Sequence, residues 1–210
     1  MKKETIILNA LDQMFPDAHV ELLHKNHFEL LVAVVLSAQT TDVAVNKVTP
    51  KLFERYKTPK ELSEAQIKDV ESFIQTIGLY RNKAKNIIML AEHIHQKYHD
   101  QVPQNRKDLE SLPGVGRKTA NVVLSNAFGI PAIAVDTHVA RVSIRLGLAD
   151  EKDNVFEIEQ KLMEKFPKSK WQHLHHQLIF FGRYHCLAKK PKCTSCPLYD
   201  LCQYPNKTTN

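Results

Sequence analysis

The sequence predicts an all-α protein. Apolar residues recur three and four positions apart along most of the 210-residue chain, which is the spacing of one helix face. Proline and glycine fall between these periodic segments, for example at Gly78, Gly114 and Pro167, where they end helices or form turns. No segment alternates apolar and polar residues as a half-buried strand does. The apolar run from Ile130 to Val135 is short enough for a strand, but a single strand would have no partner.

Each expected helix has its own apolar face. Near the N-terminus Ile7, Leu11 and Met14 keep helical spacing. The later faces consist of Val45, Val48, Leu52 and Tyr56; of Ile87, Leu90, Ala91 and Ile94; of Ala120, Val123, Leu124 and Ala127; and of Ile158, Leu162 and Phe166. The residues Thr40-Thr41-Asp42 are a helix start signal before the first of these later faces.

The composition fits a folded protein with a polyanionic partner. Apolar residues make up 43% of the chain, which is enough for hydrophobic cores, and the formal net charge is +6. This excess of Lys and Arg is compatible with nucleic acid and also with a merely basic surface. The longest apolar run, Leu30 to Leu36, is too short to span a bilayer, and the N-terminus lacks the apolar core of a signal peptide. We therefore expect a cytoplasmic protein.

All four cysteines lie near the C-terminus, in the pattern Cys186-x6-Cys193-x2-Cys196-x5-Cys202. A disulfide scaffold would distribute its cysteines over the fold, so this crowding indicates a metal site. Zinc accepts four cysteines but usually uses two C-x2-C pairs, and only one occurs here. Iron–sulfur clusters tolerate uneven spacing because each cysteine binds a different iron atom. The spacing favours an iron–sulfur cluster and leaves zinc and free thiols as alternatives.

Three lysines, Lys189, Lys190 and Lys192, lie between the first two of these cysteines. Because metal binding would fix both ends of this loop, its positive charge suits contact with a phosphate backbone. The alternative is a solvated loop that offsets the negative charge of the thiolate ligands.

The segment 112–120, Leu-Pro-Gly-Val-Gly-Arg-Lys-Thr-Ala, joins two expected helices. Gly114 and Gly116 allow left-handed backbone angles and close approach to a ligand. The N–H groups at the start of the second helix then face an anion. This pattern indicates a helix–hairpin–helix, which grips phosphates without reading base sequence. The alternative is an ordinary helix–turn–helix corner that ends in a C-cap glycine.

Lys118 and Asp136 are the candidate catalytic residues. Lys118 is expected in the first turn of the helix after the hairpin, where the macrodipole and the adjacent Arg117 both disfavour a cation. These two effects favour the neutral amine of Lys118, which is the nucleophilic form of lysine. Asp136 is expected to begin another helix, in the motif Val-Asp-Thr-His. The plain alternatives are a phosphate contact for Lys118 and a helix N-cap for Asp136.

Other polar residues carry weaker signals. His173, His175 and His176 match no known metal-ligand spacing, so we expect them on a partly exposed helix face. Gln39 precedes a helix and by itself indicates a loop position.

Together these motifs resemble those of the endonuclease III family of DNA glycosylases, within the helix–hairpin–helix superfamily. The similarity runs from residues 30–42 through Ile-Gly-Leu-Tyr at 77–80 to the last cysteine, and no hallmark position departs from the family pattern. The resemblance implies a two-lobed all-α fold with a cleft that receives a flipped base. Residues 20–130 would form a six-helix lobe with the hairpin, and residues 1–19 with 131–210 an iron–sulfur lobe. A [4Fe–4S] cluster is implied for Cys186, Cys193, Cys196 and Cys202.

The same resemblance implies a bifunctional DNA glycosylase and abasic-site lyase of base-excision repair, acting on oxidised or ring-saturated pyrimidines. Lys118, assisted by Asp136, would attack C1′ of the deoxyribose, and the resulting Schiff base would allow β-elimination 3′ to the lesion.

Gln39 would fill the gap left by the flipped nucleotide, and Leu79 would wedge against the opposite strand. Further DNA contacts are implied for Gly114, Gly116, Arg117, His138, Lys189, Lys190 and Lys192. The expected partner is damaged or abasic double-stranded DNA, bound by a monomer in the bacterial cytoplasm at the nucleoid.

Two alternatives remain. A monofunctional adenine-mismatch glycosylase would have another residue at the position of Lys118 and an added C-terminal domain, whereas this chain continues for only a few residues after Cys202. A non-catalytic, zinc-bearing DNA-binding module would explain the charge, the hairpin and the cysteines. It would leave the presence of both Lys118 and Asp136 as coincidence.

Overall fold

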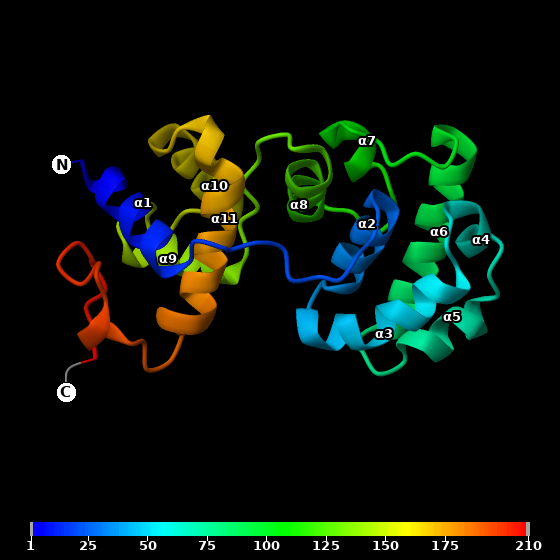
Figure 1. Cartoon of the computed structure of the whole chain (residues 1–210), viewed down its shortest axis with the longest axis horizontal. Coiled ribbons are helices and arrows are strands. Elements are labelled where there is room, and N and C mark those ends of the chain that lie inside the picture. The colour runs from blue at the N-terminus through cyan, green and yellow to red at the C-terminus, as the bar shows by residue number, and fades with distance from the viewer. Residues whose placement is uncertain (1, 209–210) are drawn as a thin grey trace. The chain divides into compact units, whose positions relative to one another are not determined.

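The computed structural model describes residues 2–208, which form two compact units (Figure 1). Unit 1 consists of Met1–Val20 and Pro131–Asn210, and unit 2 of Glu21–Ile130. This division differs from the expected one only in the place of Val20; residues 1, 209 and 210 of the expected iron–sulfur lobe lie outside the described residues. Every regular element within residues 2–208 is helical, so the all-α prediction is confirmed. None of these helices has both the length and the apolar character that a membrane crossing needs.

Unit 2, all of which is described, contains seven helices where six were expected. They are α2 (His27–Leu36), α3 (Asp42–Arg55), α4 (Pro59–Ser63), α5 (Ile67–Ile74), α6 (Tyr80–Tyr98), α7 (Arg106–Glu110) and α8 (Arg117–Phe128). The single turn α4 is too short to show periodicity in sequence. It begins at a local cap, because Thr58 Oγ1 accepts a hydrogen bond from the N–H of Glu61 at 3.1 Å.

The central helix of unit 2 is α2. Its residues from Phe28 to Leu36 are all buried, and all of them except Glu29 are apolar, as is typical of a helix in the middle of a core. α8 packs against α2, and α7 packs against α8, so the hairpin between α7 and α8 rests on the centre of the unit (Figure 1). The apolar faces expected for α3, α6 and α8 are buried, except for the partly buried Ala127.

Unit 1 joins the two ends of the chain. Its elements are α1 (Lys3–Met14), α9 (Thr137–Arg145), α10 (Val155–Lys165), a 3-10 turn (Lys168–Lys170), α11 (Trp171–Phe180), a π-helical turn (Phe181–His185) and a second 3-10 turn (Cys193–Ser195). α1 packs against α11, and α9 packs against α10 and α11. Leu11 of α1 and Leu174 of α11 are fully buried in the same core. The N-terminal helix is therefore part of the unit that carries the cysteines.

The histidines of α11 correct one expectation. His175 and His176 are only 1% and 5% exposed, and their rings stack with centroids 4.4 Å apart. His173 is more exposed and lies 4.0 Å from the carboxylate of Asp12. The expected partly exposed face is wrong for His175 and His176, because α11 packs against both α1 and α9 and has little free surface.

Candidate functional site

The hairpin in unit 2 requires glycine at one of its two glycine positions. Gly114 has a φ of +78°, and a Cβ there would lie 3.2 Å from Asn86 and from Val35. Gly116 instead has an extended backbone, with φ −100° and ψ −179°, and a Cβ there would meet nothing within 4 Å. The expectation of left-handed angles is therefore confirmed for Gly114 and wrong for Gly116.

Gly116 serves as the N-cap of α8. Glycine has no side chain, so no side-chain oxygen accepts from the first-turn N–H groups of α8, whereas Asn26 and Asn105 cap α2 and α7 in this way. These N–H groups and the helix macrodipole suit the binding of an anion. The start of α8 is thus a suitable place for a phosphate group.

Lys118 is the second residue of α8, as the sequence predicted. Its side chain is exposed and has no hydrogen-bond or ion-pair partner within unit 2. Arg117 precedes it and is partly buried. The amine of Lys118 is therefore available to a ligand and lies where the helix macrodipole disfavours a positive charge.

Gln39 and Leu79 share an uncommon backbone conformation. Their φ angles are +54° and +58°, in the left-handed region where residues with side chains are strained. Gln39 lies just after α2, and Leu79 is the N-cap of α6. Both side chains are exposed, and the exposed fraction of Leu79 is 59%. Backbone strain beneath exposed side chains on loops indicates a functional contact surface.

Asp136, in unit 1, is the N-cap of α9. Its Oδ1 accepts hydrogen bonds from the N–H groups of His138 at 2.9 Å and of Val139 at 2.8 Å. The capping alternative is therefore confirmed as a structural role. Both bonds use the same oxygen, so Oδ2 of this half-buried carboxylate has no hydrogen-bond partner within unit 1.

His138 is half-buried beside Arg141. The Nη2 of Arg141 lies 3.3 Å from Nδ1 of His138 and donates to the carbonyl of Gly182 at 2.7 Å. Burial lowers the pKa of His138, and the nearby Asp136 only partly opposes this shift. His138 is therefore neutral at pH 7 and can bind a ligand by hydrogen bonding rather than by charge.

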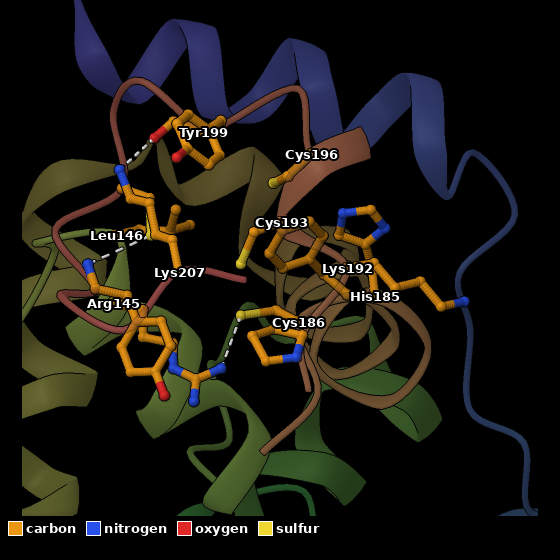
Figure 2. Close-up of a pocket in the computed structure, with 13 residues that line it drawn as sticks. Arg145, Leu146, His185, Cys186, Lys192, Cys193, Cys196, Tyr199 and Lys207 are labelled. Atoms are coloured by element: carbon orange, nitrogen blue, oxygen red, sulfur yellow. Dashed lines mark hydrogen bonds between the residues drawn. The ribbon is translucent and has the colours of Figure 1, made fainter. Parts of the chain in front are cut away.

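The four cysteines line one cavity in unit 1 (Figure 2). Cys186 and Cys193 are buried, Cys196 and Cys202 are partly buried, and all four are free thiols. Figure 2 shows the sulfur atoms of Cys186, Cys193 and Cys196 directed into the same space. Within residues 2–208 no three His, Cys, Asp or Glu side chains are placed so that they could bind one metal ion together. Four sulfur donors around one cavity fit a four-cysteine cluster, which is larger than a single ion.

Arg145, at the end of α9, contacts this cavity, and no sequence motif singled it out. It is 8% exposed, and its Nη1 donates to Sγ of Cys186 at 3.3 Å and to the carbonyl of Leu187 at 2.7 Å. The ring of Tyr204 covers its guanidinium at 3.8 Å. Burial raises the pKa of the Cys186 thiol, and Arg145 opposes this rise. Arg145 thus favours the thiolate that a metal ligand must be.

Arg141, one turn earlier on α9, donates to the carbonyl of Cys186 at 3.1 and 3.2 Å. The i, i+4 spacing of Arg141 and Arg145 in the sequence indicates a common helix face, but only the structure shows what that face holds. One helix therefore carries Asp136 at its start and braces the first cysteine at its end.

The lysine loop, defined as residues 187–192, exposes its three lysines and is held by hydrogen bonds. Lys189, Lys190 and Lys192 are all exposed, and Lys190 has a left-handed φ of +51°. Arg145 Nη2 donates to the carbonyl of Ala188 at 3.2 Å, and the N–H of Lys192 donates to the carbonyl of His185 at 3.1 Å. The three positive charges therefore lie on a loop held from α9, while its contact with DNA stays a prediction.

Comparison with known proteins identifies the class. Residues 32–168 match the family model of the HhH-GPD superfamily base excision DNA repair proteins. Residues 186–202 match the iron–sulfur binding domain of endonuclease III. The helical fold, the hairpin and the cysteine site thus define a helix–hairpin–helix DNA repair enzyme.

Similar proteins give the family. Endonuclease III of Bacillus subtilis (strain 168) is 54% identical over 207 residues, which cover 99% of this chain and 94% of that protein. Endonuclease III of Escherichia coli (strain K12) is 48% identical over 205 residues, with coverages of 98% and 97%. The structure of a trapped endonuclease III–DNA covalent intermediate, an estranged-adenine complex, aligns with a TM-score of 0.92 at 56% identity, covering 97% of this chain and 96% of that one. The chain belongs to the endonuclease III family.

Membership of this family decides several expectations. The chain is a bifunctional DNA glycosylase and abasic-site lyase of base-excision repair, and DNA is its partner. The cysteine site is that of a [4Fe–4S] cluster rather than of zinc. The mismatch-glycosylase and zinc-module alternatives are therefore not favoured.

Proposed function

We propose that this enzyme removes oxidised or ring-saturated pyrimidines from double-stranded DNA and cleaves the abasic site through Lys118. The observation that carries the proposal is the exposed amine of Lys118 at a helix start with no side-chain cap, directly after the hairpin. A related endonuclease III has been solved as a trapped covalent intermediate with DNA, which supports a covalent mechanism. The enzyme acts as a monomer in the bacterial cytoplasm, at the nucleoid.

Lys118 supplies the nucleophile in this proposal. Its neutral amine forms a bond to C1′ while the bond between C1′ and the damaged base breaks, and the base leaves with that electron pair and a proton. Opening of the sugar ring at the C1′–O4′ bond then gives the Schiff base. Loss of a proton from C2′ breaks the bond between C3′ and its oxygen, which cleaves the strand 3′ to the lesion.

Asp136 assists through its carboxylate. Its Oδ1 is used by the cap of α9, and its Oδ2 is left to accept a proton from Lys118 and to stabilise positive charge on the deoxyribose. The neutral His138, next along α9, donates or accepts a hydrogen bond to DNA.

The remaining proposed contacts hold the duplex open. Gly114, Gly116 and Arg117 bind a phosphate at the hairpin and the start of α8. Gln39 fills the gap left by the extruded nucleotide, and Leu79 wedges into the opposite strand, where its exposed apolar surface replaces stacking.

A lesion panel tests the substrate class. We expect borohydride to trap the enzyme on duplexes that contain thymine glycol, and far less on matched duplexes that contain 8-oxoguanine or only normal bases. The physical reason is that ring-saturated pyrimidines stack poorly, so extruding them costs less. The measurement is the yield of covalent adduct on a denaturing gel, with an abasic duplex as the positive control. Equal trapping on the 8-oxoguanine duplex would contradict the proposed substrate class.

The lysine loop makes a separate prediction. Changing Lys189, Lys190 and Lys192 together to glutamine should reduce the slope of log Kd against log salt concentration by about 0.9 for each phosphate that the loop no longer neutralises. A matched control changes three exposed lysines of unit 2 to glutamine, namely Lys60, Lys68 and Lys97, which gives the same change in net charge. If both triple variants keep the wild-type slope, the loop only offsets the charge of the thiolate ligands.

A further inference from the structure

Lys83 is the one buried lysine within residues 2–208. It lies in the first turn of α6 and is 5% exposed. Its Nζ donates to Oγ1 of Thr40 at 2.6 Å, and no carboxylate is paired with it within unit 2. Burial lowers the pKa of Lys83. Keeping an ammonium group here is unfavourable, and an apolar side chain of similar length would fill the same space at less cost.

The two bonds of Lys83 join two loops that are far apart in the sequence. Its side chain binds Thr40, the residue that follows Gln39. Its backbone N–H donates to the backbone carbonyl of Leu79 at 3.0 Å, as the first main-chain hydrogen bond of α6. Lys83 is therefore hydrogen-bonded both to Leu79 and to Thr40, the neighbour of Gln39. Leu79 and Gln39 both have a left-handed backbone.

The Gln39 loop has few other fixed points. The N–H of Thr40 donates to the carbonyl of Ser37 at 3.0 Å, which ties the loop back to α2. The bond from Lys83 to Thr40 is the side-chain hydrogen bond that ties it to α6. Left-handed residues with side chains persist only where their surroundings hold them in place. The Lys83–Thr40 bond is such a constraint.

We propose that Lys83 is a positioning residue that fixes the Gln39 loop relative to Leu79, so that both side chains enter the DNA stack together. This inference rests on the DNA roles proposed above for Gln39 and Leu79. It explains why a lysine is buried without an acid: its function is to reach the hydroxyl of Thr40. Lys83 itself touches neither DNA nor the reacting atoms.

The test compares Lys83→Met with Thr40→Val, because each removes the same bond from a different side. The probe is a duplex with a tetrahydrofuran abasic analogue opposite 2-aminopurine, whose fluorescence reports unstacking of the opposite base. We expect each variant to lose most of the fluorescence change seen with wild type. We also expect kcat/KM on thymine glycol to fall by up to about a hundredfold, the scale of a contact misplaced by about 1 Å. The double variant should lose no more than either single variant.

Controls separate this inference from the function on which it rests. Lys85→Met removes the same charge from an exposed position on α6 and should behave as wild type. If Gln39→Ala and Leu79→Ala leave the fluorescence change intact, the proposed DNA roles are wrong. If they abolish it and Lys83→Met and Thr40→Val do not, the positioning role is wrong. A lower melting temperature with normal fluorescence and kinetics would likewise reduce Lys83 to a structural residue.

Discussion

Lys118→Ala should form no borohydride-trapped adduct on a thymine glycol duplex, and its strand cleavage should fall by at least about a thousandfold. The Schiff base needs a primary amine at this position, and alanine has none. The side chain of Lys118 is exposed and has no partner within unit 2, so its removal should not disturb the fold. Alanine is also a better helix former than lysine, so the melting temperature should not fall. Adduct yield and single-turnover cleavage rates measure the effect.

Lys118→Arg is the matched control for this prediction. Arginine keeps the positive charge and can still contact a phosphate, but it stays protonated and cannot act as the nucleophile. We expect the arginine variant to bind abasic duplex with an affinity near that of wild type and to form no adduct. A trapped adduct from Lys118→Ala would show that another amine attacks the sugar. Weak binding by the alanine variant with normal chemistry would make Lys118 a phosphate contact, the alternative that its sequence position leaves open.

The fold was predictable because helix periodicity is a local property. Val45, Val48 and Leu52 recur at helix spacing, and all three are buried on one face of α3. The burial of His175 and His176 was missed because it depends on how many other helices pack against α11, which no spacing within α11 reveals. Local chemistry predicts an element and one of its faces. It does not predict how much of the remaining surface is covered.

In the candidate site, too, some features follow from local sequence and others depend on tertiary packing. The left-handed angle of Gly114 and the cap made by Asp136 follow from short motifs, and both are found. The contact of Lys83 with Thr40 and that of Arg145 with Cys186 join residues about forty positions apart. Their geometry is set by tertiary packing, so neither residue carried a signal in the sequence.

Asp136→Asn should slow base removal by about a hundredfold, because it removes the charge that takes a proton from Lys118 and stabilises the deoxyribose cation. Asparagine caps helices about as well as aspartate, and its side-chain oxygen can keep both bonds, to His138 and Val139. The free energy of unfolding should therefore change by less than about 1 kcal/mol, the part due to the charge at the helix start. Single-turnover excision of thymine glycol and denaturant unfolding measure the two effects.

Asp136→Ala completes this comparison, because it removes both the charge and the cap. We expect it to excise as slowly as the asparagine variant while losing about 1 kcal/mol more stability, the usual worth of an N-cap. The kinetic effect would then follow the charge, and the stability effect would follow the hydrogen bonds at Oδ1. Near-normal excision by Asp136→Asn, with a stability loss confined to Asp136→Ala, would leave Asp136 as a cap alone and require another base for Lys118.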